Sequence, residues 1–218
     1  MLHFAPVLRA YHQTELIEAG SDEAGRGCYA GPVFAAAVIL PRDFYHPLLN
    51  DSKQVVEEDR EILRELIEEY AIAWAVASVD NQQIDRINIL KASFRAMHLA
   101  IAQLQPSPGY LLIDGNRFIA YPGARHQCVV KGDGIYASIA AASILAKTHR
   151  DAYMRQMHKE FPEYGWDRNK GYGTPEHRDA IEKHGLCKYH RKSYNIDPKL
   201  MGLFDGIPDI YDIERDYS

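Results

Sequence analysis

Four carboxylates occupy positions from which a folded chain could bring them into one cleft. Asp22 and Glu23 are adjacent at the head of the glycine-rich stretch "DEAGRG". Asp114 ends the apolar run "YLLID", and Asp133 lies between glycines in "KGDG". Functional sites of open α/β sheets form beyond the strand ends, so these side chains could converge there. Clustered carboxylates repel one another unless a cation neutralises them, and their oxygens favour Mg²⁺ or Mn²⁺. Two such ions could activate a water molecule and stabilise the leaving oxygen of a phosphoryl transfer.

Each of these carboxylates also has a simpler interpretation. An aspartate after an apolar strand, such as Asp114, is often a helix cap or a turn former. Asp133, between two glycines, could likewise belong to a turn. Neighbours on a regular strand face opposite sides, so Asp22 and Glu23 can serve one metal centre only if the chain distorts there. The glycines that follow permit such a distortion, and spacing alone leaves both interpretations open.

Glycines also flank two residues that could contact a nucleic acid. The backbone of Gly25, Arg26 and Gly27 could approach a sugar-phosphate closely, because glycines carry no Cβ atom. Its amide and carbonyl groups could recognise a ribose 2′-hydroxyl. In "GYGTPEH", Tyr172 could present its ring for stacking on a base or a sugar. The alternatives are a plain hairpin turn with an exposed arginine, and a tyrosine that packs at a loop edge.

The charge distribution permits a local phosphate-binding face. The formal net charge is −5, but residues 121–200 carry 14 Lys and Arg against 9 Asp and Glu, and six of the ten histidines. An acidic total with a basic third is compatible with nucleic-acid binding. The basic residues in this region could contact phosphates or be ordinary surface charge; they include Lys147, Arg150, Lys170 and Arg178.

The elements that must position these residues alternate between strands and helices. The patterns predict a strand hairpin, an amphipathic helix, a third strand, a helix, two apolar strands ending in Asp114 and Asp133, a long helix, and a helix opened by Pro175. The strand hairpin is expected over residues 16–24 and 31–41, the amphipathic helix over 57–70, the third strand over 71–80 and the next helix over 87–104. The two apolar strands are expected over 109–115 and 126–133, the long helix over 135–161, and the last helix from 175 onward. This order indicates an α/β protein with a mixed sheet and a helical C-terminal part.

Composition limits the class of protein. A chain of 218 residues with 46% hydrophobic content fits one main globular domain. Three widely spaced cysteines argue against a disulfide framework and a zinc site, and favour a reducing compartment. The start of the chain lacks the pattern of a signal peptide, and the longest apolar run is too short to span a bilayer. We therefore expect a cytoplasmic protein with no membrane association.

Together the motifs resemble a known family, the type 2 ribonucleases H and specifically bacterial ribonuclease HII. The similarity extends from about residue 20 to about residue 194, and the motifs occur in the family's order. They are "DEAGRGCYAGPV", "NDSK", "INILKASFRAMHLAI", "LLIDGN", "KGDGIYASIAAASILAKTHRD", "GYGTPEH" and "HRKSY".

The resemblance implies a ribonuclease H-like fold, a five-stranded mixed sheet flanked by helices with a C-terminal helical extension. On this basis residues 1–195 form the catalytic domain with its extension, and residues 196–218 form an acidic tail. The implied activity is that of a metal-dependent endoribonuclease on the RNA strand of RNA–DNA hybrids. It also implies cutting 5′ of single ribonucleotides in duplex DNA, as in ribonucleotide excision repair. Two metal ions, Mg²⁺ or Mn²⁺, would leave a 3′-hydroxyl and a 5′-phosphate.

The family's motifs also assign roles to individual residues. The metal-binding and catalytic carboxylates would be Asp22, Glu23, Asp114 and Asp133. Gly25, Arg26 and Gly27 would read the ribose 2′-hydroxyl, and Tyr172 would stack on the deoxyribose of the following nucleotide. Lys53 of "NDSK" and Lys147 are assigned to substrate binding.

Departures from the family pattern are small. Tyr194 in "HRKSY" stands where phenylalanine is common, and the acidic tail matches no motif and could contact an unknown partner. The related ribonuclease HIII lacks the "GRG" stretch and usually carries an extra N-terminal domain.

We expect a monomer acting on nucleic acid. A catalytically silent ribonucleotide sensor is disfavoured because all four carboxylates are present, and a resolvase or transposase is disfavoured by "GRG" with "GYGT".

Overall fold

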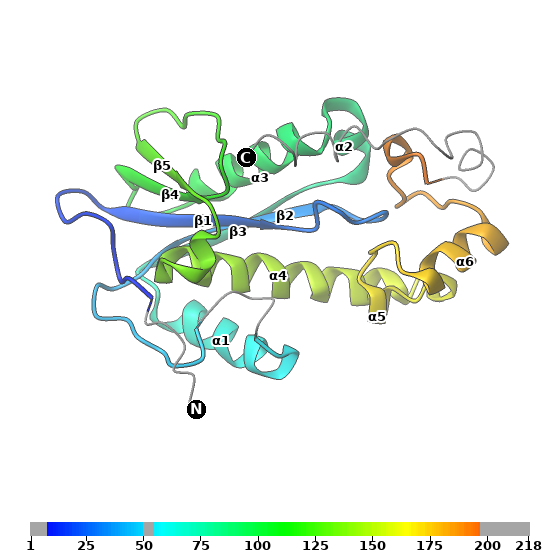
Figure 1. Ribbon diagram of the computed structural model, residues 1–218, viewed down its shortest axis with the longest axis horizontal. Helices are drawn as coiled ribbons and strands as arrows, with labels where there is room; N and C mark the ends of the chain where they lie inside the picture. Colours follow the sequence, from blue (N-terminus) through cyan, green and yellow to red (C-terminus); the bar gives the residue numbers. More distant parts are fainter. Residues whose placement is uncertain (1–7, 50–54, 197–218) are drawn as a thin grey trace.

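A five-stranded mixed sheet lies at the centre of the molecule, with helices on both faces (Figure 1). The computed structural model describes residues 8–49 and 55–196. The strands follow the order β3-β2-β1-β4-β5; they are β1 (Glu18–Ala24), β2 (Val33–Ile39), β3 (Ala73–Val79), β4 (Tyr110–Asp114) and β5 (Arg125–Val129). β2 pairs antiparallel with β1 and β3, whereas β4 pairs parallel with β1 and β5. This arrangement confirms the five-stranded mixed sheet expected from the sequence.

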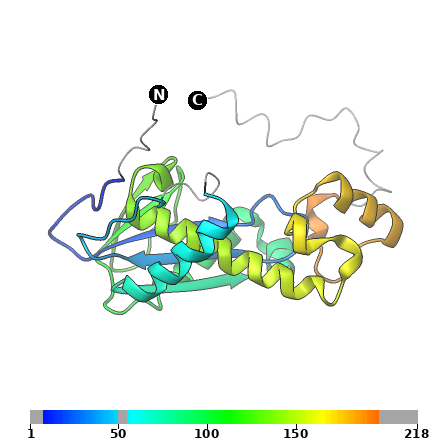
Figure 2. The same ribbon diagram turned by 90° about the horizontal axis from the view of Figure 1, so that it is seen from below.

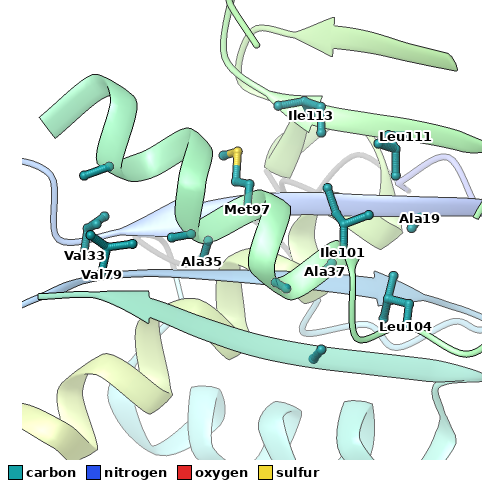
Figure 3. Packing of buried hydrophobic residues seen from close by; sticks show 14 of the residues in the cluster. Ala19, Val33, Ala35, Ala37, Val79, Met97, Ile101, Leu104, Leu111 and Ile113 are labelled. Carbon is teal, nitrogen blue, oxygen red and sulfur yellow. The ribbon is translucent and has the colours of Figure 1, made fainter. Parts of the chain in front are cut away.

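Two helical layers cover the sheet. α3 (Ile89–Ile101), preceded by the short α2 (Asn81–Ile87), packs on one face, where Met97 and Ile101 contact buried strand residues (Figure 3). α1 (Glu57–Tyr70) and α4 (Ala137–His158) lie on the opposite face (Figure 1). The amphipathic character predicted for the first helix from Ile62, Leu63, Leu66 and Ile67 is confirmed in part: Leu63 and Ile67 of α1 are fully buried, whereas Leu66 is half-buried and Ile62 is 51% exposed.

Small residues allow α4 to approach β1 closely. A Cβ atom on Gly20 would lie 2.2 Å from the backbone carbonyl carbon of Ser138, so only glycine fits at this position of the strand. Ala140 and Ala141 are fully buried in the same helical layer. The contact fixes the first half of α4 against the strand that carries Asp22.

The chain after α4 forms a small helical extension at one end of the sheet (Figure 2). It contains α5 (Trp166–Asn169), α6 (Pro175–His184) and the 3-10 turns η2 (Pro162–Tyr164) and η3 (Lys192–Tyr194). Its own core contains the fully buried Trp166, whose ring stacks on that of Tyr164 at 5.1 Å. Ile196, 3% exposed, packs in the same core. This part agrees with the predicted C-terminal helical extension.

Two details of the sequence prediction were wrong. The strand expected to reach Asp133 ends at Val129, because Lys131 adopts a left-handed conformation (φ 55°) and Asp133 lies in the 3-10 turn η1 (Gly132–Gly134). The helix α2 was not expected. Its N-cap is Asp80, whose carboxylate accepts a hydrogen bond from the backbone N–H of Gln83 at 2.7 Å.

Some predictions fall outside the described residues. Lys53 and the acidic tail after Ile196 lie there, so the division of the chain at residue 195 stays a prediction. Across residues 8–49 and 55–196, no helix combines the length and the apolar character needed to cross a membrane.

Candidate functional site

The parallel pairing of β1 with β4 brings Asp22 and Asp114 together. Ser21 pairs with Ile113, and the next residues along the two strands are these aspartates. Asp22 is only 6% exposed, whereas Asp114 is half-buried. Burial raises the pKa of the Asp22 carboxyl well above its usual value, and the charges of Glu23 and Asp114 raise it further. A cation at this point would relieve that repulsion.

A turn that precedes α4 places Asp133 beside the end of β4. The backbone N–H of Gly132 donates a hydrogen bond of 2.7 Å to Oδ1 of Asp114. A Cβ atom on Gly132 would lie 2.5 Å from Cδ1 of Ile139, so glycine allows the turn to approach the strand. Asp133 follows directly and is 5% exposed. α4 itself contributes Ser143, whose hydroxyl hydrogen-bonds to Asp22.

The four predicted carboxylates are therefore neighbours in space to different degrees. Asp22, Glu23 and Asp114 interact electrostatically, and Asp133 is linked to Asp114 through Gly132. The distortion considered for β1 does not occur, since Asp22 and Glu23 pair in regular register with β2. The Glu23 carboxylate instead forms an ion pair with Arg26 at 3.1 Å. As arranged in the described part of the chain, no three Asp, Glu, His or Cys side chains form a ready metal cluster. The oxygen donors themselves suit a hard divalent cation.

Arg191, from the "HRKSY" segment, holds the "GRG" loop that follows β1. This side chain is fully buried and donates hydrogen bonds of 2.7 Å to the carbonyls of both Gly25 and Arg26. The hydroxyl of Tyr194 donates a further bond of 2.6 Å to the carbonyl of Arg26. Gly25 has a φ of +94°, which glycine adopts readily. Arg191 therefore fixes the loop from its buried side, and the loop is exposed to solvent at Arg26 and Gly27.

Arg150 of α4 supports the same loop from another direction, which corrects the view of this residue as a phosphate contact. Arg150 is 1% exposed, and its guanidinium donates to the carbonyls of Ala30, Pro32 and Lys170 at 2.8–3.2 Å. A Cβ atom on Gly25 would lie 2.0 Å from its Nε. Sequence reasoning missed the supporting role of Arg150 and of Arg191, because a buried arginine has no distinctive local pattern.

Tyr172 lies beside the "GRG" loop. Its backbone forms a bridge with that of Cys28, and the N–H of Tyr29 donates to the carbonyl of Gly171 at 2.8 Å. Tyr172 as a whole is 41% exposed, and the Arg150 guanidinium carbon lies 5.9 Å from the centre of its ring. The structure therefore brings together the two glycine-flanked segments that sequence reasoning singled out, although about 145 residues separate them in the chain.

A groove of about 880 Å³ extends from the "GRG" loop to the α2–α3 junction and η3. Its charged lining residues are Arg26, Asp85, Arg86 and Lys91. The Asp85 carboxylate accepts hydrogen bonds from the backbone of Lys192 and Ser193 and from the Ser193 hydroxyl, at 2.6–3.1 Å. Among the described residues, the lining therefore carries three cationic side chains against one carboxylate, so the groove has an excess of positive charge.

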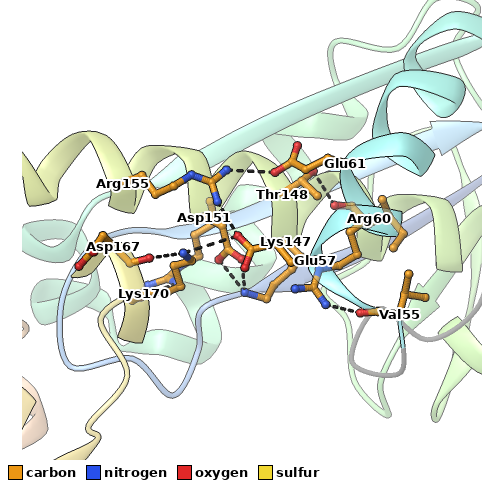
Figure 4. A network of polar contacts seen from close by, with 12 residues as sticks. Val55, Glu57, Arg60, Glu61, Lys147, Thr148, Asp151, Arg155, Asp167 and Lys170 are labelled. Atoms are coloured by element: carbon orange, nitrogen blue, oxygen red, sulfur yellow. Dashed lines mark hydrogen bonds and ion pairs between the residues drawn. The ribbon is translucent and has the colours of Figure 1, made fainter. Parts of the chain in front are cut away.

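The other basic residues that the sequence offered as phosphate contacts, Lys147, Lys170 and Arg178, are engaged in contacts within the protein. Lys147 pairs with both carboxylate oxygens of Asp151 at 2.5 and 2.6 Å, within a polar network between α1 and α4 (Figure 4). Burial lowers the pKa of Lys147, although Asp151 opposes this shift. Lys170 is buried and donates to the carbonyl of Asp167. Arg178 donates to the carbonyl of Gly173 at 3.0 Å, which supports the loop that carries Tyr172.

Comparison with known proteins gives a consistent match. The family model described as Ribonuclease HII matches residues 19–196 of this chain. A relative named Ribonuclease HII, from Bacteroides thetaiotaomicron, is 60% identical over 190 residues, which cover 87% of this chain and 95% of the relative.

Solved structures show the same fold. The ribonuclease H2 of Pyrococcus horikoshii is similar with a TM-score of 0.71 and 23% identity, covering 87% of this chain and 99% of that one. Bst-RNase HIII in complex with Mn²⁺ is similar with a TM-score of 0.68 and 22% identity, covering 90% of this chain and 72% of that one.

Proposed function

Since this chain belongs to the ribonuclease HII family and is a ribonuclease H enzyme, an endoribonuclease for the RNA of RNA–DNA hybrids, we propose that it also cuts duplex DNA at single embedded ribonucleotides. The cut falls on the 5′ side of the ribonucleotide and leaves a 3′-hydroxyl and a 5′-phosphate. The observation that carries the proposal is geometric: Asp22 and Asp114 meet at the ends of the paired strands β1 and β4, and the "GRG" loop that follows Asp22 lies beside Tyr172. Neighbouring acids at such a strand end are typical of a catalytic site.

The carboxylates Asp22, Glu23, Asp114 and Asp133 would hold two divalent cations, Mg²⁺ or Mn²⁺. Oxygen donors suit both ions, and Bst-RNase HIII, which shares the fold, is in complex with Mn²⁺. When bound, the cations supply activation of the attacking water and stabilisation of the leaving oxygen. The protein's own contribution is to hold the ligands: the Gly132 N–H orients Asp114, and the Ser143 hydroxyl orients Asp22.

Recognition of the ribonucleotide falls to the two loops beyond the carboxylates. The backbone of Gly25, Arg26 and Gly27, a loop exposed at Arg26 and Gly27, would contact the ribose 2′-hydroxyl, held in shape by Arg191. The exposed ring of Tyr172 would stack on the sugar of the next, deoxy, nucleotide. These adjacent loops would therefore read an RNA–DNA junction.

The positive groove beside the "GRG" loop suits the sugar-phosphate backbone of the duplex. Arg86 and Lys91 in its lining would contact phosphates. Lys53 and Lys147 stay candidates for substrate binding; Lys147 would have to exchange its pairing with Asp151 for a phosphate. The monomeric state, the cytoplasmic location and a partner for the acidic tail stay predictions.

The test is cleavage of a DNA duplex that contains one ribonucleotide, in separate reactions with Mg²⁺ and Mn²⁺. We expect one cut at the 5′ side of the ribonucleotide, with end groups identified by mass spectrometry. The same duplex built entirely of DNA is the control and should stay intact. Absence of product with both metals would overturn the proposal, and tight binding without cleavage would indicate a ribonucleotide sensor instead.

A further inference from the structure

Two histidines contact each other in the core of the helical extension, on the buried side of the loop that carries Tyr172. His177 is the third residue of α6, and His190 precedes η3; both are fully buried. Their Nε2 atoms are 3.2 Å apart. No step of the proposed cleavage uses either histidine, so the purpose of this pair needs a separate explanation.

Hydrogen-bond donors with fixed roles determine the protonation of both rings. The backbone N–H of Cys187 lies 3.0 Å from Nδ1 of His190, and the indole N–H of Trp166 lies 3.1 Å from Nε2 of His177. Both groups can only donate, so both of these ring nitrogens accept. Neutral His190 then carries its proton on Nε2, and neutral His177 carries its proton on Nδ1.

These two tautomers complete a continuous chain of hydrogen bonds. Nε2–H of His190 points to Nε2 of His177 and shares the one lone pair of that nitrogen with the Trp166 indole N–H. Nδ1–H of His177 donates to the backbone carbonyl of Tyr172 at 2.8 Å. That carbonyl also accepts from the N–H of Thr174 at 2.8 Å. Both acceptor positions of the Tyr172 carbonyl are therefore used, and every ring nitrogen of the pair has a partner.

The hydrogen-bond chain ends at the backbone carbonyl of Tyr172, the residue proposed to stack on the substrate. Tyr172 has glycine on each side, and the residue is 41% exposed. Glycine neighbours give a backbone wide conformational freedom, so an exposed ring in this setting needs a separate restraint. The histidine pair supplies that restraint from the buried side, while the Cys28 bridge supplies it from the "GRG" side.

We propose that the hydrogen-bonded pair His190–His177 is a positioning device that fixes Tyr172 for recognition of the RNA–DNA junction. This inference rests on the proposed function and deepens it, since it identifies His177 as a specificity-determining residue that never touches the substrate. Its effect is on the choice between substrates, and the cleavage step itself depends on the carboxylates.

The first test does not depend on activity. Long-range ¹H–¹⁵N spectra of the full chain distinguish the two histidine tautomers. We expect the Nδ1–H form for His177 and the Nε2–H form for His190 near neutral pH. The opposite tautomer at His177 would remove the bond to Tyr172 and overturn the proposal, whatever the enzyme cleaves.

The second test measures substrate choice. The readout is the ratio of kcat/KM on a duplex with one ribonucleotide to kcat/KM on a uniform RNA–DNA hybrid. Loss of an aromatic stack corresponds to about 5- to 100-fold, and we expect this loss of the ratio in Tyr172→Ala and a loss of the same direction in His177→Ala. In the Tyr172→Ala background, His177→Ala should change the ratio no further.

Two variants control for simple loss of folding. His177→Asn keeps an N–H near the position of Nδ1, so it should retain most of the ratio even where thermal stability falls. His184→Ala changes an exposed histidine on the same helix and should leave the ratio unchanged. A normal ratio in His177→Ala, or an equally reduced ratio in His177→Asn and His177→Ala, would overturn the positioning role. An inactive wild-type chain would instead contradict the proposed function.

Discussion

The carboxylates around Asp22 and the histidine pair in the extension are both groups of titratable side chains in which burial disfavours the charged form, yet their partners differ. Asp22 lies beside two further acids, and its pKa is raised by burial and by their charges. Burial and the neighbouring His177 lower the pKa of His190 to about 4, so the pair stays neutral. The acids repel one another, whereas the histidines form a closed hydrogen-bond chain.

This difference distinguishes a ligand-binding site from a network with a structural role. A group of like charges raises the free energy of the folded protein until something neutralises it, so it marks a place where a ligand binds. A neutral network in which each group has a partner needs no ligand and stabilises one geometry. Buried polar residues thus have two functions in this protein. Both pKa shifts favour the neutral form, so the two groups are distinguished by their partners: further acids beside Asp22, and hydrogen-bonding groups around His177 and His190.

The largest effect should come from removing a carboxylate. Asp114→Asn keeps the oxygen that accepts from Gly132 but removes the charge, so we expect kcat to fall by about 10³-fold or more. Without divalent metal, the same change should raise the free energy of unfolding by about 1 kcal/mol, because it relieves repulsion on Asp22. Urea unfolding and cleavage kinetics measure both effects.

The matched control for that change is Asp179→Asn, an exposed aspartate on α6. It should alter neither kinetics nor stability. If Asp114→Asn destabilises the metal-free protein instead, the carboxylate group is not electrostatically unfavourable and the contrast between the two regions fails.

An intermediate effect should appear as a function of pH. Below pH 6.5 the unfolded chain binds a proton at His190 that the folded chain excludes until about pH 4. The stability contributed by the neutral pair should therefore fall with decreasing pH across this window, by about 1.4 kcal/mol per pH unit for one proton.

His190→Gln isolates this contribution, because glutamine can donate from a similar position but does not titrate. The stability advantage of the wild type over His190→Gln should shrink between pH 6.5 and pH 4, as measured by urea unfolding without divalent metal. Asp22 titrates in both proteins, so its opposite contribution cancels. An advantage that is independent of pH would show that the pair is not held neutral.

The smallest effect should come from Tyr194→Phe. The change removes the hydroxyl bond to the Arg26 carbonyl and the 2.9 Å bond that the hydroxyl accepts from Nη1 of Arg191, but it leaves the two bonds from Arg191 to the Gly25 and Arg26 carbonyls. We expect a loss of about 0.5–1.5 kcal/mol in stability. Activity on single ribonucleotides should fall modestly through a higher KM. Tyr189→Phe is the control, since its hydroxyl bonds the surface residue Glu160 at 3.1 Å and also Lys188, both away from the "GRG" loop. Equal effects of the two changes would mean that Tyr194 does not support the "GRG" loop.

Sequence patterns predicted the framework because local periodicity determines it. The helix expected over residues 57–70 has those bounds in the structure, and the β1–β2 hairpin follows the alternation around the "GRG" turn. The four carboxylates were found because each follows or interrupts an apolar run. Their recognition as one site, however, came from the family resemblance, since spacing alone left surface charge as an alternative.

The supporting residues could not be predicted in the same way. Arg150 and Arg191 resemble surface arginines in sequence, and only the carbonyls that face them in the folded chain explain their burial. The turn at Asp133 depends on a left-handed Lys131, a conformation that a lysine does not signal. The tautomers of the histidine pair likewise follow from donors brought together by tertiary folding.

The bonds from Arg191 to Gly25 and Arg26 also determine when the enzyme becomes complete during its synthesis. They join positions 166 and 165 residues apart, so the first turn of the sheet acquires its restraint only after nearly the whole described chain has left the ribosome. Contacts of such long sequence separation form late in folding. A nascent chain therefore carries Asp22, Glu23 and Asp114 long before Arg191 can fix the loop that we propose for recognition of the ribose.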